Sequence, residues 1–139
     1  MIGLIQHSPA RRALLSLTAL VFAGLALQTL ARPDLVAAAV GNGLHSANDY
    51  SELHAIYAGL WLGHTALGLL AARHVDSQPL LGDVLGLLIF SQALGRVMSA
   101  AQWGWPDGVL RVMMAVEIIS GLTLWLVRPS QGVQPIQSK

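Results

Sequence analysis

Residues 87–100 read LLIFSQALGRVMSA, and residues 111–127 read RVMMAVEIISGLTLWLV. Both stretches are strongly apolar, yet the first carries Arg96 and the second carries Glu117 in its interior. A single charge at the centre of a bilayer costs about 2.5–3.5 kcal/mol on insertion scales. Because the two charges have opposite signs, an ion pair between neighbouring helices is the least costly way to bury them. We therefore expect two membrane helices whose charged faces meet inside a bundle.

The composition of the whole chain also favours a membrane protein. Its 139 residues are 54% hydrophobic and 11% charged, with a mean hydropathy of +0.58, whereas soluble chains are about 25% charged. A net charge of +1 without a basic run predicts no nucleic-acid partner. The sequence contains no cysteine, which excludes disulfides and thiolate metal sites.

Four apolar segments of helical length follow one another along the chain. We expect them at about 13–31, 48–73, 83–102 and 108–127, with a short surface helix between 34 and 49. The first resembles a signal peptide, but about 18 apolar residues suit a span, so we expect it to be retained. Short connectors make consecutive helices antiparallel. The predicted fold is an all-α, integral membrane, up-and-down four-helix bundle with a short surface helix after the first span.

The distribution of basic residues predicts the orientation of this bundle. We expect 1–12 to be a cytoplasmic tail, 13–127 to be the four-helix transmembrane domain, and 128–139 to be a flexible cytoplasmic tail. One side of the bundle holds Arg11, Arg12, Arg73, Arg128 and Lys139. The opposite side holds only Arg32 and Arg111. The positive-inside rule then places both termini in the cytoplasm.

Polar residues of the third and fourth segments are predicted to lie at one depth. Arg96 lies roughly 8 residues from the connector between these segments and Glu117 roughly 9, which puts both about 12–14 Å below the surface. Gln92 precedes Arg96 by one helical turn. We expect these side chains to face the interior of the bundle.

The second segment adds an aromatic and histidine stripe. Its spacing of 3, 4, 3 and 4 keeps five residues on one helical face, namely His54, Tyr57, Trp61, His64 and Gly68. If this face turns toward the other two segments, a pocket forms between them. The expected ligand-binding residues are Arg96, Glu117, His54, Tyr57, Trp61, His64 and Gln92.

Small residues predict where helices approach closely. We expect close contacts at Gly59, Gly63, Gly68, Gly82 and Gly86. In the first segment, Gly24 and Gln28 share a face that we expect to point inward.

Several kinds of chemistry lack a motif in this sequence. There is no H-E-x-x-H or E-x-x-H pair, so we predict no metal site. His54 and His64 lie about 15 Å apart on one helix, which does not suit a bis-histidine haem site. No G-x-S-x-G, P-loop or G-x-G-x-x-G motif occurs. We predict no resident cofactor, with a quinone or a lipid left open as a ligand.

Three stretches carry a resemblance to a known family. They are HAIYAGLWLGHTALGLL at 54–70, ALGRVMS at 93–99 and AVEIISGL at 115–122. This pattern is similar to a family of small bacterial four-helix inner-membrane proteins classified only as a domain of unknown function. The resemblance covers about 52–126 and implies a multi-pass protein of the bacterial inner membrane. It aligns Arg96 and Glu117 with the family's own arginine and glutamate, and it implies no activity.

These observations leave three functions open. The first is a non-catalytic membrane protein. It would be either an accessory subunit of a larger membrane complex or homo-oligomer, or a protein that binds a lipid-like or quinone-like amphiphile from among the membrane lipids. Alternatively, the chain is a membrane-embedded enzyme in which Glu117 is the general acid or base, tuned by Arg96, with His64 or His54 as proton partner. The third is a proton-coupled carrier of a small solute. An Arg–Glu pair fits a role in fixing helix register as well as any of these.

Overall fold

The computed structural model describes residues 5–129, and four long helical segments dominate this part of the chain. These are α1 (Ser8–Ala31), a continuous segment over Ala47–Arg73, α5 (Pro79–Trp103) and α6 (Gly108–Leu126). All four are long and apolar enough to cross a membrane. The predicted all-α fold, with four helical segments able to span a membrane, is confirmed.

The second long segment is not a uniform α-helix. It consists of α3 (Ala47–His54), a π-helical turn η1 (Ala55–Leu60) and α4 (Trp61–Arg73). Its start is fixed by a capping box, in which Ser46 and Asp49 each accept a hydrogen bond from the other's backbone N–H. The short helix α2 (Pro33–Ala39) lies where a surface helix was expected. The π-helical turn has no counterpart in the prediction.

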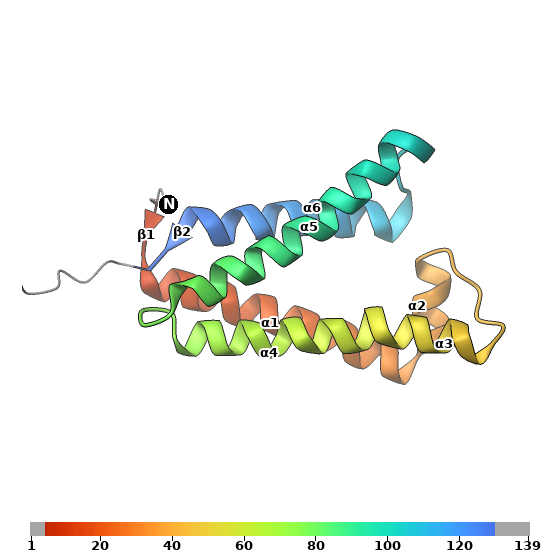
Figure 1. Cartoon of the computed structure of the whole chain (residues 1–139), viewed down its shortest axis with the longest axis horizontal. Coiled ribbons are helices and arrows are strands. Elements are labelled where there is room, and N and C mark those ends of the chain that lie inside the picture. Colours follow the sequence, from red (N-terminus) through yellow and green to blue (C-terminus); the bar gives the residue numbers. More distant parts are fainter. Residues whose placement is uncertain (1–4, 130–139) are drawn as a thin grey trace, which may run out of the picture.

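The long helices pack as two pairs. Helix α1 packs mainly against α4, and α5 packs mainly against α6, while α4 joins the pairs through α5. Figure 1 shows α5 close to α4 at its start and farther from it toward its end. The buried residues of α5 accordingly stop at Ala93, well before the helix ends at Trp103. We call the end that carries α2 and α3 the open end and the opposite end the closed end.

Small residues allow the close contacts within this arrangement, at some but not all of the predicted positions. An added Cβ would lie 3.0 Å from Ala19 Cβ at Gly68, 2.6 Å from Arg11 Nη2 at Gly82, and 3.0 Å from Trp125 Nε1 at Gly86. At Gly63 it would meet nothing within 4 Å, and at Gly59 only the backbone of the same helix. The expectation of close contact is therefore wrong for Gly59 and Gly63.

Helix α1 buries a different face from the one expected. Its buried face comprises Arg11, Leu15, Ala19, Phe22, Ala26 and Thr29, whereas Gly24 and Gln28 are exposed. The expectation that Gly24 and Gln28 point inward is wrong. Phe22 offers far more apolar area than a glycine and a glutamine, so burying its face releases more free energy.

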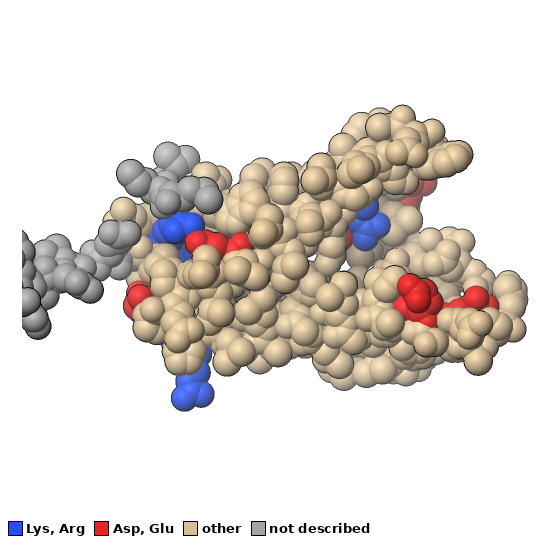
Figure 2. Space-filling model, in the orientation of Figure 1, with Lys and Arg blue, Asp and Glu red and all other residues tan. Residues whose placement is uncertain are grey.

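The closed end is fastened by an ion cluster and a two-residue strand pair. Strand β1 (Ile5–Gln6) pairs in parallel with β2 (Val127–Arg128). Arg11, completely buried, donates to the Leu124 and Val127 carbonyls and to Asp83 Oδ1, while Arg128 donates to Asp83 Oδ2. Figure 2 shows the basic and acidic groups side by side at this end.

The observed ends of α1 and α6 change the predicted boundaries of the helical region. Helix α1 begins at Ser8 instead of residue 13, because His7 Nδ1 accepts the Ala10 N–H at 3.0 Å and so caps the helix. Residues 8–12, expected to belong to a tail, are thus helical. The tail expected over 128–139 lies outside the described residues from 130 onward.

Candidate functional site

Arg96 of α5 and Glu117 of α6 form the ion pair that their equal depth predicts. Arg96 Nε lies 2.9 Å from Glu117 Oε2, and Nη2 lies 3.2 Å from Oε1, so both carboxylate oxygens are engaged. The side chain of Glu117 is 7% exposed and that of Arg96 is 21% exposed. The carboxylate is therefore buried, whereas part of the guanidinium faces open space.

His64 and Gln92 meet beside this pair and link α4 to α5. The Leu60 carbonyl can only accept, so His64 Nδ1 donates to it at 2.8 Å. This leaves Nε2 as the acceptor for the Gln92 Nε2–H group at 3.3 Å. The imidazole is 2% exposed, and the Phe22 ring lies 4.8 Å from it. Both ring nitrogens of His64 are thus engaged within the protein.

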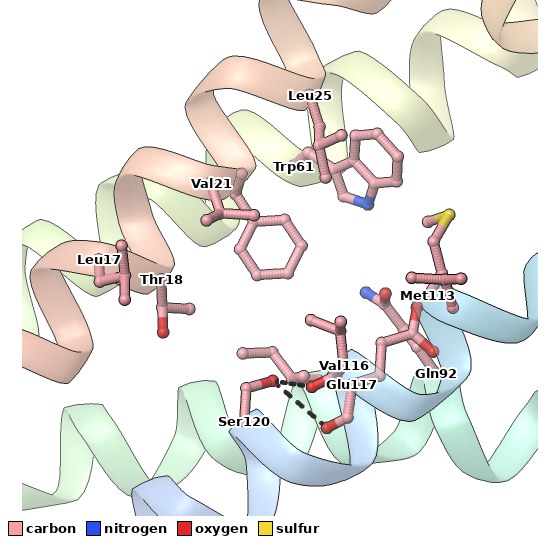
Figure 3. Close-up of a pocket in the computed structure, with 13 residues that line it drawn as sticks. Leu17, Thr18, Val21, Leu25, Trp61, Gln92, Met113, Val116, Glu117 and Ser120 are labelled. Carbon is pink, nitrogen blue, oxygen red and sulfur yellow. Dashed lines mark hydrogen bonds between the residues drawn. The ribbon is translucent and has the colours of Figure 1, made fainter. Parts of the chain in front are cut away.

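A first cavity of about 250 Å³ lies between α1 and α6. Figure 3 shows Leu17, Val21 and Leu25 of α1 on one side, opposite Val116, Glu117 and Ser120 of α6. Ile89 and Gln92 of α5 and Trp61 of α4 contribute further to the lining. The cavity is apolar except where Glu117, Gln92, Ser120 and Thr18 reach its wall.

A second cavity of about 440 Å³ lies toward the open end. Its lining includes Arg96 and Ser99 of α5 on one side and residues of η1 on the other. Trp61 and Gln92 line both cavities, while Glu117 lines only the first and Arg96 only the second. The ion pair therefore stands at the junction of an apolar cavity and a more polar one. In Figure 2, which has the orientation of Figure 1, a basic group lies in the hollow between the end of α5 and the helical segment below it in the view.

The structure brings most of the predicted site residues to these cavities. Tyr57, Trp61, Gln92, Arg96 and Glu117 line them. His64 lies beside them but lines neither. Of the three candidate catalytic residues, Arg96 and Glu117 pair directly, and His64 contacts Gln92.

His54 is the exception among the predicted residues. Its Nδ1 donates to the Tyr50 carbonyl of its own helix at 2.7 Å, and its ring stacks on that of Tyr50. The prediction assumed one α-helical period from His54 to Gly68, but η1 interrupts it. A π-helical turn contains about one residue more than an α-helical turn, so α3 is rotated relative to α4.

The wall formed by α1 was not expected. Leu17, Val21, Phe22 and Leu25 line the first cavity, whereas the predicted pocket lay between the second, third and fourth segments. The signal was present in the sequence, because Leu17, Val21 and Leu25 are spaced by four residues and therefore share one helical face.

The chemistry of the site suits a ligand that accepts hydrogen bonds. Arg96 uses two of its five N–H donors on Glu117, and within residues 5–129 the other three have no protein acceptor. The same range contains no group of three or more His, Asp or Glu placed to hold a metal ion. Charge-assisted hydrogen bonds from arginine are strong and bind planar or anionic oxygen groups.

Comparison with known proteins identifies a family and no individual relative. No curated protein and no solved structure matches the chain significantly. The family described as Domain of unknown function (DUF4345) matches residues 10–127, which include all four long helical segments except the first residues of α1. The chain belongs to this family of unknown function.

Proposed function

We propose that this chain is a multi-pass protein of the bacterial inner membrane that binds a lipid-like or quinone-like amphiphile without transforming it. The apolar part of the ligand occupies the first cavity, and its head accepts hydrogen bonds from Arg96 in the second. The observation that carries the proposal is the position of the Arg96–Glu117 pair at the junction of the two cavities.

The first cavity is accessible from the side of the bundle. Leu17 and Val21 of α1 line it and are 60% and 45% exposed, and Val112 and Val116 of α6 line it and are 61% and 52% exposed. Residues that both line a cavity and reach the surface mark its opening. In a bilayer this opening between α1 and α6 faces the acyl chains, which gives an apolar tail a lateral route of entry.

The contacts of the acidic and basic groups favour binding over catalysis. Both oxygens of Glu117 accept hydrogen bonds from Arg96, and both ring nitrogens of His64 are engaged by Leu60 and Gln92. A general acid or base must reach its substrate within hydrogen-bond distance. Groups already held in place by protein partners suit an anchor better than a proton carrier.

The charge at the two ends supports the proposed orientation. Arg11, Arg12, Arg73 and Arg128 belong to the closed end, whereas Arg32 and Arg111 belong to the open end. By the positive-inside rule the closed end and both termini lie in the cytoplasm. The ligand is then drawn from the membrane lipids, and no resident cofactor is required.

Native mass spectrometry of the protein purified in mild detergent tests the proposal. The probes are a lysophospholipid and decylubiquinone. We expect the wild type to retain at least one of them, and Val116→Phe, which fills the first cavity, to release it. Ile119→Phe is the matched control, because Ile119 lies on α6, is 64% exposed and lines neither cavity. A wild type that retains neither probe would overturn the proposal.

A further inference from the structure

A third cavity continues the site toward the open end. It measures about 320 Å³, and its lining includes Asp49 and Glu52 of α3 and Ile56 and Tyr57 of η1. Ile56 and Tyr57 of η1 also line the second cavity. The three cavities therefore adjoin one another in a row, through Trp61 and Gln92 and then through Ile56 and Tyr57.

The charge of the lining changes sign along this row. The first cavity is largely apolar, the second contains the partly exposed guanidinium of Arg96, and the third contains the carboxylates of Asp49 and Glu52. Asp49 uses Oδ2 to accept the His45 and Ser46 N–H groups at 2.9 and 2.8 Å. Within residues 5–129, Glu52 has no ion-pair partner and is exposed. A cation in the third cavity would therefore meet an uncompensated carboxylate.

We infer that the ligand is a zwitterionic single-tail amphiphile, such as a lysophospholipid with a terminal ammonium group. Its tail lies in the first cavity, its phosphate accepts hydrogen bonds from the free edge of Arg96, and its ammonium lies near Glu52 and Asp49. This inference rests on the proposed function and narrows the ligand within it. Phosphate suits the second cavity because arginine binds its oxygens in a two-pronged geometry.

The alternative head groups match the row of cavities less well. An anionic head without an ammonium group would place only negative charge beside Glu52 and Asp49, and like charges repel. A quinone head accepts hydrogen bonds from Arg96 but leaves the carboxylates of the third cavity without a partner. Only a head with an inner anion and an outer cation complements both charged cavities.

The test compares lysophosphatidylethanolamine with lysophosphatidylglycerol carrying the same acyl chain, by native mass spectrometry of the full chain in mild detergent. We expect the wild type to prefer the ethanolamine lipid about fivefold, the contribution of one partly exposed ion pair. Glu52→Gln should abolish the preference, and Glu52→Lys should reverse it. Asp107→Asn is the matched control, because Asp107 lies at the same end but pairs with Arg111 and lines none of the cavities.

The outcomes separate this inference from the proposed function. If the wild type binds both lysolipids equally and Val116→Phe releases both, the inference is wrong and the proposed function stands. A preference for the glycerol lipid, or one that survives Glu52→Gln, also overturns the inference. If neither lysolipid nor decylubiquinone binds, the proposed function itself fails.

Discussion

Arg11 of α1 and Asp83 of α5 form a buried ion pair, with 2.8 Å between Nη2 and Oδ1. Helix α1 belongs to one helix pair and α5 to the other, so this contact ties the two pairs together at the closed end. Arg128 donates to the second oxygen of the same carboxylate. Asp83 is therefore the shared acceptor that joins α1, α5 and the residues after α6.

Removing either partner of this ion pair should strongly destabilise the fold. Asp83→Asn removes the anionic partner of the buried Arg11. Arg11→Met leaves Asp83 with Arg128 alone and the Leu124 and Val127 carbonyls without the donor that Arg11 supplies. Breaking a buried pair costs about 3–5 kcal/mol. Thermal unfolding in detergent measures the loss. Arg12→Met is the control, since Arg12 lies 3.5 Å from Asp76 with both side chains more than half exposed, and such pairs contribute about 0–1 kcal/mol. Equal losses of stability in Arg11→Met and Arg12→Met would contradict a stabilising role for the buried pair.

The Arg96–Glu117 pair should respond differently to single and double substitution. Arg96→Met or Glu117→Leu alone should lower the free energy of unfolding by about 3 kcal/mol, because the remaining charge has no partner. The double variant should recover most of this loss, since apolar residues replace both charges. It should nevertheless fail to retain the lysolipid, because the donors of Arg96 are gone. A double variant that still binds the probe would show that the pair is purely structural.

Substitution of glycines should separate close contacts from open positions. In Gly121→Ala the new Cβ would lie 3.1 Å from Phe90 Cβ and 3.2 Å from the Gly86 carbonyl oxygen, so α5 and α6 must separate. We expect a loss of about 1–3 kcal/mol. Gly95→Ala on α5 meets nothing within 4 Å and should be neutral or slightly stabilising, because alanine favours helix over glycine. The transition midpoints in thermal unfolding check both expectations, and equal shifts would argue against the close contact.

Restoring an α-helical period in η1 should impair recognition of the head group more than stability. Deletion of Ala55 would turn α3 by about 100° relative to α4, the rotation of one residue in an α-helix. Glu52 would then leave the third cavity, and the preference for the ethanolamine lysolipid should disappear. Ala55→Ser keeps the length of the segment and serves as the control. The ratio of the two bound lysolipids is the measurement, and an unchanged ratio after deletion would refute a role for the π-helical turn.

The core of the site could be predicted because depth follows from residue count in helices joined by short connectors. Arg96 and Glu117 lie at similar distances from the turn at 104–107, so their pairing needed no knowledge of side-chain packing. Counting along a helix is accurate as long as its period is constant.

Two features could not be predicted in this way. His54 lies off the site because η1 changes the helical period, and local sequence carries no simple signal for that change. Arg11 was assigned to a solvated tail because a basic residue before an apolar segment is usually solvated. Its partner Asp83 is distant in sequence, and only the packing of α1 against α5 shows that the guanidinium is buried.

The cluster around Asp83 also sets an order on assembly during synthesis. Helices α1 and α4 come from the first half of the chain and α5 and α6 from the second, so each pair can form from segments made one after the other. Arg11 is translated at the start of α1, whereas Arg128 follows α6 and is translated after every helix of the bundle. The Arg128–Asp83 ion pair can therefore form only after the last helix has been made. In a product truncated before Arg128, Asp83 can pair only with Arg11.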